Sequence, residues 1–200
     1  DILLMLDFDG TLVPIVNNPA DCYLSSEARD LLSALSRRED FTTCIISGRS
    51  LADVRKRVGI KGIYYGGSHG LEISGPAMNF VHPEAEYAAK TMRSLKTAVR
   101  KEFGSMPGIL IESKPFSFTL HYRMLREKNI RSVINRFKRL ISDLSSKEQI
   151  SILMGKKVLE VMPHIDWNKG TAVRLLGSRI GERLLPVYVG DDRTDETVFK

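Results

Sequence analysis

The chain has 200 residues, of which 42% are hydrophobic and 27% charged, and its formal net charge is +6. The composition is typical of a soluble globular protein, and no apolar run approaches the ~20 residues that span a bilayer. The lysines and arginines are dispersed without interleaved aromatic residues, so we expect neither a membrane nor a nucleic acid as a partner. Cys22 and Cys44 lie in unrelated contexts, which favours a reduced, cytoplasmic protein.

The first part of the chain alternates predicted strands and helices. A strand over 2–7 is followed by an amphipathic helix that begins at Ser25, a strand over 42–46, a helix over 51–58 and a strand over 62–65. Each strand ends in a polar segment that contains glycine. Because ligands bind at the carboxyl ends of the strands in an open α/β sheet, we expect these segments to meet at one site.

The middle of the chain has a different pattern. Two amphipathic helices alternate with two pairs of short strands, which is typical of an α+β unit. The expected elements are a helix over 84–103, strands over 109–112 and 116–123, a helix over 130–144 and a hairpin over 150–162 that turns near Gly155. We therefore expect a second domain over 77–162, inserted into the first.

The parallel sheet resumes after this insertion, with a helix over 169–180 and a strand over 185–189. The sequence thus predicts an α/β fold, with a Rossmann-like core over 1–76 and 163–200 and an inserted α+β cap domain. Because a further helix and strand are expected after such a loop, we expect the core to continue beyond residue 200.

Acidic residues follow two of the predicted buried strands. Asp7 and Asp9 come after the first strand, and Asp191, Asp192 and Asp195 come after the last. A single aspartate at a strand end is also common as a turn or helix-cap residue. Carboxylates this close repel one another unless a cation lies between them, and oxygen ligands without histidine or cysteine favour Mg²⁺ over zinc.

The same segments contain the groups that phosphoryl transfer requires. Asp7 is a candidate nucleophile, and Asp9 is a candidate acid and base for the leaving oxygen and the hydrolytic water. The candidate phosphate ligands are Thr11, Ser47, the backbone of Gly48, and Lys169, which also supplies a positive charge. An ordinary helix cap at Ser47 and a solvated lysine at 169 are the alternatives.

Four motifs in this order resemble the haloacid dehalogenase superfamily. They are Asp7-Phe8-Asp9-Gly10-Thr11, Ser47-Gly48-Arg49, Lys169-Gly170 and the segment from Gly190 to Glu196. Further segments make the chain similar, over nearly its whole length, to the trehalose-6-phosphate phosphatase family. These are Gly66 to Gly70, Glu112-Ser113-Lys114, Leu120 to Arg123 and Gly155 to Pro163.

The resemblance implies Mg²⁺-dependent hydrolysis of trehalose 6-phosphate, a phosphorylated disaccharide, through an aspartyl-phosphate intermediate. It implies that Mg²⁺ is held by Asp7, the backbone carbonyl of Asp9 and Asp191, with Asp192 and Asp195 around these ligands. It also implies a set of sugar contacts, which are Arg49 and His69 in the core and Glu112, Lys114 and Glu160 in the cap.

Two alternatives remain open. The substrate could be another sugar phosphate, such as sucrose 6-phosphate or a mannosyl phosphoglycerate, because the core motifs address only the phosphate and the metal. Alternatively, the chain could be a non-catalytic domain of a larger synthase, and a synthase domain or subunit is also the expected protein partner. Several carboxylates around one cleft argue against a purely structural role.

Overall fold

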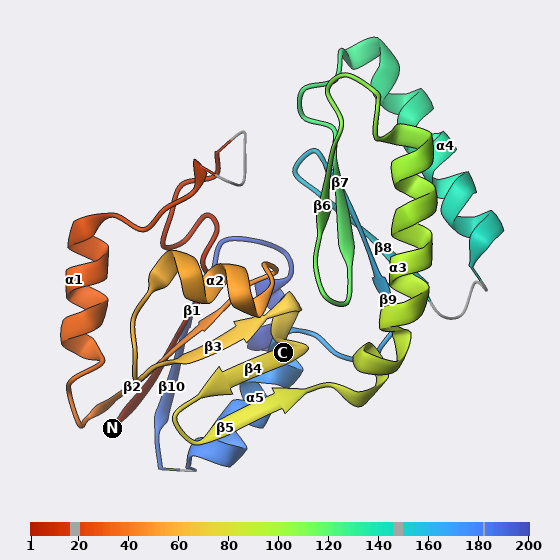
Figure 1. Ribbon diagram of the computed structural model, residues 1–200. Helices are drawn as coiled ribbons and strands as arrows, with labels where there is room; N and C mark the ends of the chain where they lie inside the picture. Colours follow the sequence, from red (N-terminus) through yellow and green to blue (C-terminus); the bar gives the residue numbers. More distant parts are fainter. Residues whose placement is uncertain (17–20, 146–149, 182) are drawn as a thin grey trace. The chain divides into compact units, whose positions relative to one another are not determined.

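The structure is a computed structural model (Figure 1). It describes residues 1–16, 21–145, 150–181 and 183–200. The chain divides into two compact units. One consists of Asp1–His82 together with Trp167–Lys200, and the other is the intervening segment Pro83–Asp166.

The first unit is built on a six-stranded sheet, which contains the predicted parallel strands. In sheet order the strands are β10 (Leu185–Val189), β1 (Ile2–Leu6), β2 (Phe41–Ile46), β3 (Tyr64–Gly67), β4 (Glu72–Gly75) and β5 (Met78–Val81). Strands β10, β1, β2 and β3 are parallel, whereas β4 and β5 are antiparallel to their neighbours. The predicted α/β class with a parallel core sheet is confirmed.

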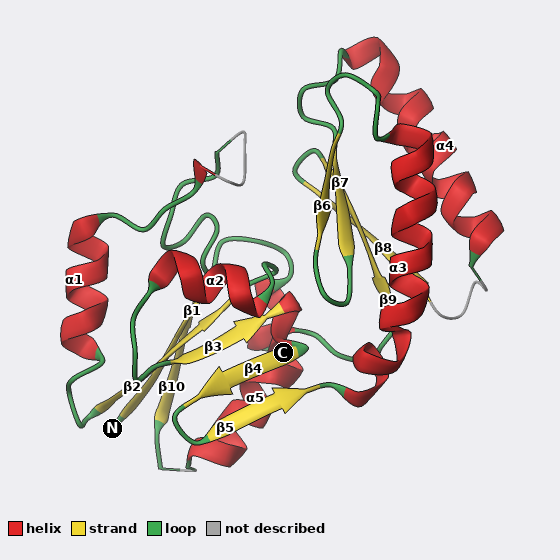
Figure 2. Ribbon diagram, in the orientation of Figure 1, coloured by secondary structure: helices red, strands yellow, loops and turns green. Residues whose placement is uncertain are grey.

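Helices cover both faces of this sheet (Figure 2). Leu6 on β1 packs in one core cluster with residues of α1 (Ser26–Leu35) and α2 (Leu51–Val58). Met5, its neighbour, packs in another cluster with residues of α5 (Lys169–Ile180). Because successive side chains of a strand point to opposite faces, the uninterrupted apolar run of β1 serves both clusters.

The end of the first segment differs from the prediction. Strands β4 and β5 form a hairpin that pairs Gly75 with Met78, so residues 77–82 belong to the first unit rather than to the insertion. The sequence suggested that the chain crosses between domains at Gly75-Pro76, but these residues lie at the turn of the hairpin. The second unit accordingly begins at Pro83 and ends at Asp166, several residues after each predicted boundary.

The second unit contains a four-stranded antiparallel sheet with two helices on one face (Figure 1). The strands, in sheet order, are β6 (Leu110–Ser113), β7 (Phe118–His121), β9 (Val158–Pro163) and β8 (Ile150–Gly155), and the helices are α3 (Pro83–Phe103) and α4 (Glu127–Leu144). The rings of Phe103 and Phe137 lie 6.0 Å apart between the two helices. Within the described ranges, no helix is both long and apolar enough to cross a membrane.

Three aromatic rings lie where the two segments of the first unit end. The ring of Trp167 stacks on Phe80 at a centroid distance of 5.4 Å, and His82 meets the same indole at 4.9 Å. His82 is the last residue of the first segment and Trp167 is the first residue of the second. This aromatic cluster therefore holds together the two points at which the chain leaves and re-enters the first unit.

Candidate active site

Asp7 lies directly after β1 and is almost completely buried. The strand alternation that directs Met5 toward α5 also directs Asp7 toward that helix. There its Oδ1 atom accepts a hydrogen bond of 2.7 Å from Nζ of Lys169, the first residue of α5. Burial raises the pKa of Asp7 from 3.8 to about 7, although the ion pair with Lys169 opposes the rise.

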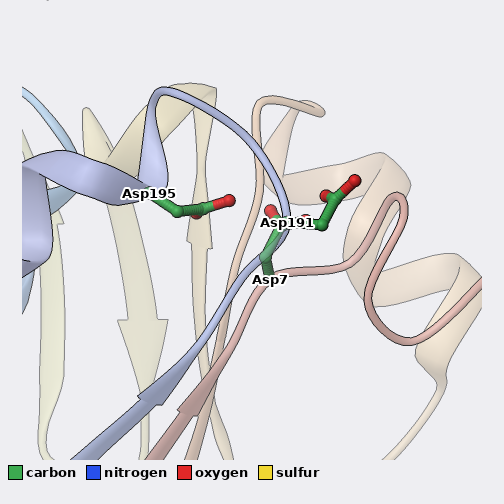
Figure 3. A group of neighbouring side chains, drawn as sticks. All are labelled: Asp7, Asp191 and Asp195. Carbon is green, nitrogen blue, oxygen red and sulfur yellow. The ribbon is translucent and has the colours of Figure 1, made fainter.

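Three carboxylates converge beside this pair. Oxygen atoms of Asp7, Asp191 and Asp195 all lie within 4.8 Å of one another, and Figure 3 shows that they come from the ends of β1 and β10 and from the loop that follows β10. Gly10 makes the approach of the two loops possible. Its φ is +97°, and a Cβ atom there would lie 2.2 Å from Oδ2 of Asp191. Any other residue would be strained and would displace the Asp191 carboxylate.

The carboxylate of Asp195 is held by three protein donors. Its Oδ1 atom accepts from Nζ of Lys169 at 2.7 Å and from the hydroxyl of Tyr188 at 2.5 Å, and its Oδ2 atom accepts from the backbone N–H of Asp192 at 3.0 Å. Burial alone would lower the pKa of Lys169, but its contacts with Asp7 and Asp195 raise it above the ordinary value. Lys169 is therefore a permanent cation between two buried carboxylates.

The Asp192 side chain forms hydrogen bonds within its own loop. Its Oδ1 atom accepts from the backbone N–H of Thr194 at 2.7 Å and from the hydroxyl of the same residue at 2.6 Å. Burial would raise the pKa of Asp192, but these hydrogen bonds and the charge of Lys169 hold it below the ordinary value. Asp192 thus shapes the loop that carries Asp191, which is consistent with a place around a metal rather than on it.

The donor set fits a hard divalent cation. The cluster offers only carboxylate oxygens, with neither thiol nor imidazole among the groups that converge there within the described residues. Oxygen ligands of this kind suit Mg²⁺, which usually takes one or two protein carboxylates and fills its remaining positions with water or phosphate oxygens. Because Asp195 is already held by Lys169 and Tyr188, Asp7 and Asp191 are the better candidates for side-chain ligands.

Asp9 is held by a forked ion pair. Its two carboxylate oxygens accept from Nε and Nη2 of Arg49, each at 2.7 Å. The Arg49 side chain is 8% exposed and that of Asp9 is 37% exposed, so the carboxylate of Asp9 stays accessible at the end of a buried guanidinium. The resemblance implied a sugar contact for Arg49. In this structure its guanidinium contacts Asp9, and the sugar contact stays a prediction.

The loops after β2 and β3 are joined beside Asp9. Ser47 is fully buried, and its Oγ atom accepts from the backbone N–H of Arg49 at 3.1 Å. The ring of His69 packs on Gly48, where a Cβ atom would lie 2.8 Å from its Cε1 atom. Within the described part of the chain, the buried hydroxyl of Thr11 has no hydrogen-bond partner. A hydroxyl that donates to a bound phosphate would be left in this state when no ligand is present.

The backbone of the β3 loop is unusual. Ser68 and His69 adopt consecutive φ values of 51° and 59°, in the left-handed region that non-glycine residues seldom enter. The N–H of Ser68 donates to the carbonyl of Arg49 at 2.7 Å, and that of His69 donates to the carbonyl of Ser47 at 3.0 Å. These bonds hold the loop that places the His69 ring against Gly48. The sugar contact expected of His69 stays a prediction.

The remaining predicted residues lie in the second unit, on the sheet face opposite the helices. Phe118 and Leu120 pack against the helices, so the alternating Thr119 and His121 point to the other face. Glu112 of β6 meets His121 there, with Oε2 and Nε2 2.8 Å apart.

The second predicted pair is more buried. Oε1 of Glu160 accepts from Nζ of Lys114 and from the hydroxyl of Ser117, each at 2.8 Å. Glu160 on β9 lies opposite Thr119 of β7, which in turn lies opposite Glu112 of β6. Glu112 and Glu160 therefore share one face of the sheet, and Lys114, the residue after β6, reaches Glu160 on that face.

Sequence reasoning missed several residues that support these groups. Tyr188, Asp53 and Ser117 each contact a predicted site residue. His121, which lies in the family-like segment from Leu120 to Arg123 but was given no role, contacts Glu112. Tyr188 occurs in an apolar strand and Asp53 in the first turn of a helix, where each has an ordinary structural explanation. Only the alternation of polar and apolar residues over 117–121 carried a signal, because it places Ser117, Thr119 and His121 on one side of the chain.

Comparison with known proteins gives a consistent result. The sequence model of the trehalose-phosphatase family matches residues 5–200. The chain is 36% identical over 207 residues to the protein named probable trehalose-phosphate phosphatase 4 of Oryza sativa subsp. japonica, covering 100% of the chain and 55% of that protein. It is 34% identical over 203 residues to the trehalose-phosphate phosphatase of Mycobacterium ulcerans, covering 98% and 50%. The chain thus spans about half the length of these curated relatives.

Solved structures share the fold. The C-terminal domain of trehalose-6-phosphate phosphatase from C. albicans aligns with a TM-score of 0.82 and 28% identity, covering 98% of this chain and 71% of that one. A trehalose-6-phosphate phosphatase related protein aligns with a TM-score of 0.84 and 25% identity, covering 98% and 81%. The expected haloacid dehalogenase fold is confirmed by these likenesses, and the match over residues 5–200 shows that the chain belongs to the trehalose-phosphatase family.

Proposed function

We propose that this chain hydrolyses trehalose 6-phosphate to trehalose and phosphate, with Asp7 as the nucleophile. The observation that carries the proposal is the buried carboxylate of Asp7, held 2.7 Å from Lys169 and grouped with Asp191 at the carboxyl ends of parallel strands. A buried nucleophile beside a fixed cation suits attack on a phosphate, whose negative charge must be neutralised. The names of the relatives support the choice of substrate, and the contact between Asp7 and Lys169 supports the proposed chemistry.

The first half-reaction is an in-line displacement at phosphorus. A carboxylate oxygen of Asp7 forms a bond to phosphorus, the bond from phosphorus to the sugar oxygen breaks, and a proton from Asp9 passes to that oxygen. Lys169, the hydroxyls of Ser47 and Thr11, and the N–H of Gly48 hold the other phosphate oxygens. A bound Mg²⁺, held by Asp7, Asp191 and the carbonyl of Asp9, would neutralise the negative charge of the phosphate.

The second half-reaction restores Asp7. A water oxygen forms a bond to phosphorus, the bond from phosphorus to Asp7 breaks, and the proton of the water passes to Asp9. An ionised carboxylate has about four lone-pair positions. The fork of Arg49 uses one on each oxygen of Asp9, so others remain for the proton. Asp9 therefore ends the cycle protonated and ready for the next leaving group.

The second unit is proposed to recognise the sugar. A disaccharide presents many hydroxyl groups, and charged side chains form stronger hydrogen bonds to hydroxyls than neutral ones do. Glu112, Lys114 and Glu160 supply such groups on one sheet face, and the partners described above fix their orientation. His69 in the first unit is proposed as a further sugar contact. The face fits a polar substrate, and the free thiols of Cys22 and Cys44 support the proposal of a reducing, cytoplasmic location.

The two alternatives are tested by one experiment. Phosphate release with and without Mg²⁺ is measured for trehalose 6-phosphate, sucrose 6-phosphate, a mannosyl phosphoglycerate and glucose 6-phosphate. We expect strict Mg²⁺ dependence and at least about a tenfold preference in kcat/KM for trehalose 6-phosphate. A preference for another sugar phosphate would retain the mechanism and discard the substrate. No release from any of the four would favour the non-catalytic domain.

A further inference from the structure

A chain of four alternating charges ends at Asp9. Arg49 donates to Asp9 through Nε and Nη2 at 2.7 Å each, and its third donor, Nη1, reaches Oδ2 of Asp53 at 2.9 Å. Nε of Arg57 donates to the same Oδ2 atom at 2.8 Å. Residues 49, 53 and 57 are spaced by four, so they lie along one side of α2 and of the turn before it. We call Asp9, Arg49, Asp53 and Arg57 the charge ladder.

Asp53 determines the orientation of the Arg49 guanidinium. A guanidinium is planar, and its five N–H groups form a rigid fork. If Arg49 contacted only Asp9, the guanidinium plane could follow the Asp9 carboxylate, which is 37% exposed. The third contact, to Asp53, ties the plane to α2. The guanidinium also lies over the ring of Phe8, with its Cζ atom 5.5 Å from the centroid. The fork therefore presents Nε and Nη2 to Asp9 in one orientation.

Arg57 completes the ladder. Its guanidinium and that of Arg49 both donate to Oδ2 of Asp53, so the Asp53 carboxylate is held from both sides. Nη1 of Arg57 also donates to the backbone carbonyl of Cys22 at 2.5 Å. The thiol of Cys22 in turn lies 3.5 Å from Oδ1 of Asp9. Arg57 is thus linked to Asp9 in a second way, through Cys22, in addition to the contacts through Asp53 and Arg49.

A simpler explanation of Asp53 is that it stabilises the start of α2. Its backbone N–H donates to Oγ of Ser50, the helix cap, at 3.3 Å, and an acidic residue in the first turn interacts favourably with the helix dipole. That explanation requires only a negative charge near the helix start. It does not account for a side chain 30% exposed whose Oδ2 atom bridges two arginines that are 8% and 11% exposed.

We propose that Asp53 is a positioning residue, which acts through Arg49 to hold the carboxyl group of Asp9 in line for proton transfer. The proposal rests on the function proposed above, because it assigns Asp53 to the acid and base step of that reaction. Removal of Asp53 should slow the steps in which Asp9 moves a proton and should spare the attack of Asp7 on phosphorus.

The test is Asp53→Asn, compared with wild type on two substrates in saturating Mg²⁺. With trehalose 6-phosphate, kcat should fall about tenfold or more while KM changes less than about twofold, because an oriented acid or base contributes about 10²–10⁴ in rate. With p-nitrophenyl phosphate, the leaving group departs without a proton. Its first-turnover release should therefore stay within about twofold of wild type while the steady-state rate falls, since hydrolysis of the phosphoenzyme still requires Asp9.

Two further variants separate positioning from stability. Asp53→Glu retains the charge and should recover part of the loss in kcat. Glu27→Gln removes a first-turn carboxylate from α1, which has no ion pair in the described structure, and should leave both rates unchanged. Circular dichroism confirms that each variant is folded, and if Asp53→Asn is not, Arg57→Ala, which removes the outer support of Asp53, is used in its place.

Three results would show that Asp53 does not support proton transfer by Asp9. They are kinetics of Asp53→Asn equal to those of Glu27→Gln, an equal loss of first-turnover release and steady-state rate with p-nitrophenyl phosphate, or a rise in KM without a fall in kcat. A faster Asp53→Asn enzyme would also overturn the proposal, since Arg49 would then restrain Asp9 instead of aligning it. Failure of the underlying function gives a different result, because wild type itself would form no acid-stable label on Asp7 from a ³²P-labelled substrate.

Discussion

Oδ1 of Asp7 and Nζ of Lys169 lie 2.7 Å apart, although the two residues are separated by 162 positions in the sequence. One follows the first strand of the chain and the other begins the helix that packs beneath that strand. The whole second unit lies between them in the sequence, so the proposed nucleophile and its cation meet only when both segments of the first unit have folded together. The position of Asp7 is therefore fixed by the core and not by a surface loop.

Asp7→Asn should abolish turnover while preserving the fold. An amide of the same size can still accept from Lys169, but it is not a nucleophile toward phosphorus, and we expect kcat to fall by about 10⁴ or more. Phosphate release and the thermal unfolding midpoint are the two measurements. Activity retained within tenfold of wild type in a folded variant would disprove the assignment of Asp7.

Binding of Mg²⁺ should depend on pH through Asp7. Burial holds the pKa of this carboxyl at about 7, and a metal binds the ionised form. Below pH 7 a proton competes for the group, so affinity should rise with pH up to about 7 and change little above it.

The shift of the unfolding midpoint caused by Mg²⁺, measured from pH 5.5 to 8.5, reports this affinity because a ligand that binds the folded state stabilises it. In Asp7→Asn the pH dependence should be lost. A shift in wild type that is constant between pH 6 and 8 would contradict the competition between Mg²⁺ and a proton at Asp7 near pH 7.

Lys114→Met should weaken recognition of the sugar and spare the chemistry. It removes a charge from the face that is proposed to contact the disaccharide and leaves Glu160 with Ser117. We expect KM for trehalose 6-phosphate to rise about tenfold, as for the loss of a charged hydrogen bond, with kcat/KM for p-nitrophenyl phosphate unchanged. Lys96→Met is the matched control, because the ammonium group of Lys96 makes an exposed hydrogen bond to Ser113 in the same unit. Equal effects of the two changes would contradict the cap assignment.

Phe137→Ala should destabilise the second unit. The ring is fully buried between α4 and α3, and its removal leaves a cavity against Phe103. The expected loss is about 3–5 kcal/mol in the free energy of unfolding, measured with denaturant and by hydrogen exchange of the two helices. Leu144→Ala on the same helix removes a side chain that is 51% exposed and should change stability by less than about 1 kcal/mol. A small effect of Phe137→Ala would mean that this core is loosely packed.

The sequence predicted the site where a local pattern carries the information. Asp7 and Asp191 each follow an apolar strand, in a polar segment that contains one glycine, Gly10 or Gly190. Their common edge therefore follows from the rules of parallel sheets. The contact between Asp53 and Arg49 has no such signature, because an acidic residue near a helix start is common everywhere. In the sequence, Tyr188 likewise looks like one more residue of an apolar strand. Its hydrogen bond to Asp195 forms only because the loop after β10 folds back and brings Asp195 next to it.

The hairpin of β4 and β5 was missed for a related reason. Four residues are too few to show a clear alternation, and Gly75-Pro76 fits a domain crossing as well as a turn. The pair of Glu112 and His121 depends on the register of β6 against β7, in which Glu112 lies opposite Thr119 and Leu110 opposite His121. Register is a property of two strands together, and neither strand specifies it alone.

The aromatic cluster of the first unit gives the protein an internal optical reporter. Trp167 is the single tryptophan of the sequence, and its indole packs between Phe80 and His82 where the chain leaves and re-enters the first unit. Emission from this one indole therefore arises from the junction and from nowhere else. A ligand, a metal or a substitution that rearranges the junction would change its intensity or wavelength, with no label added to the chain.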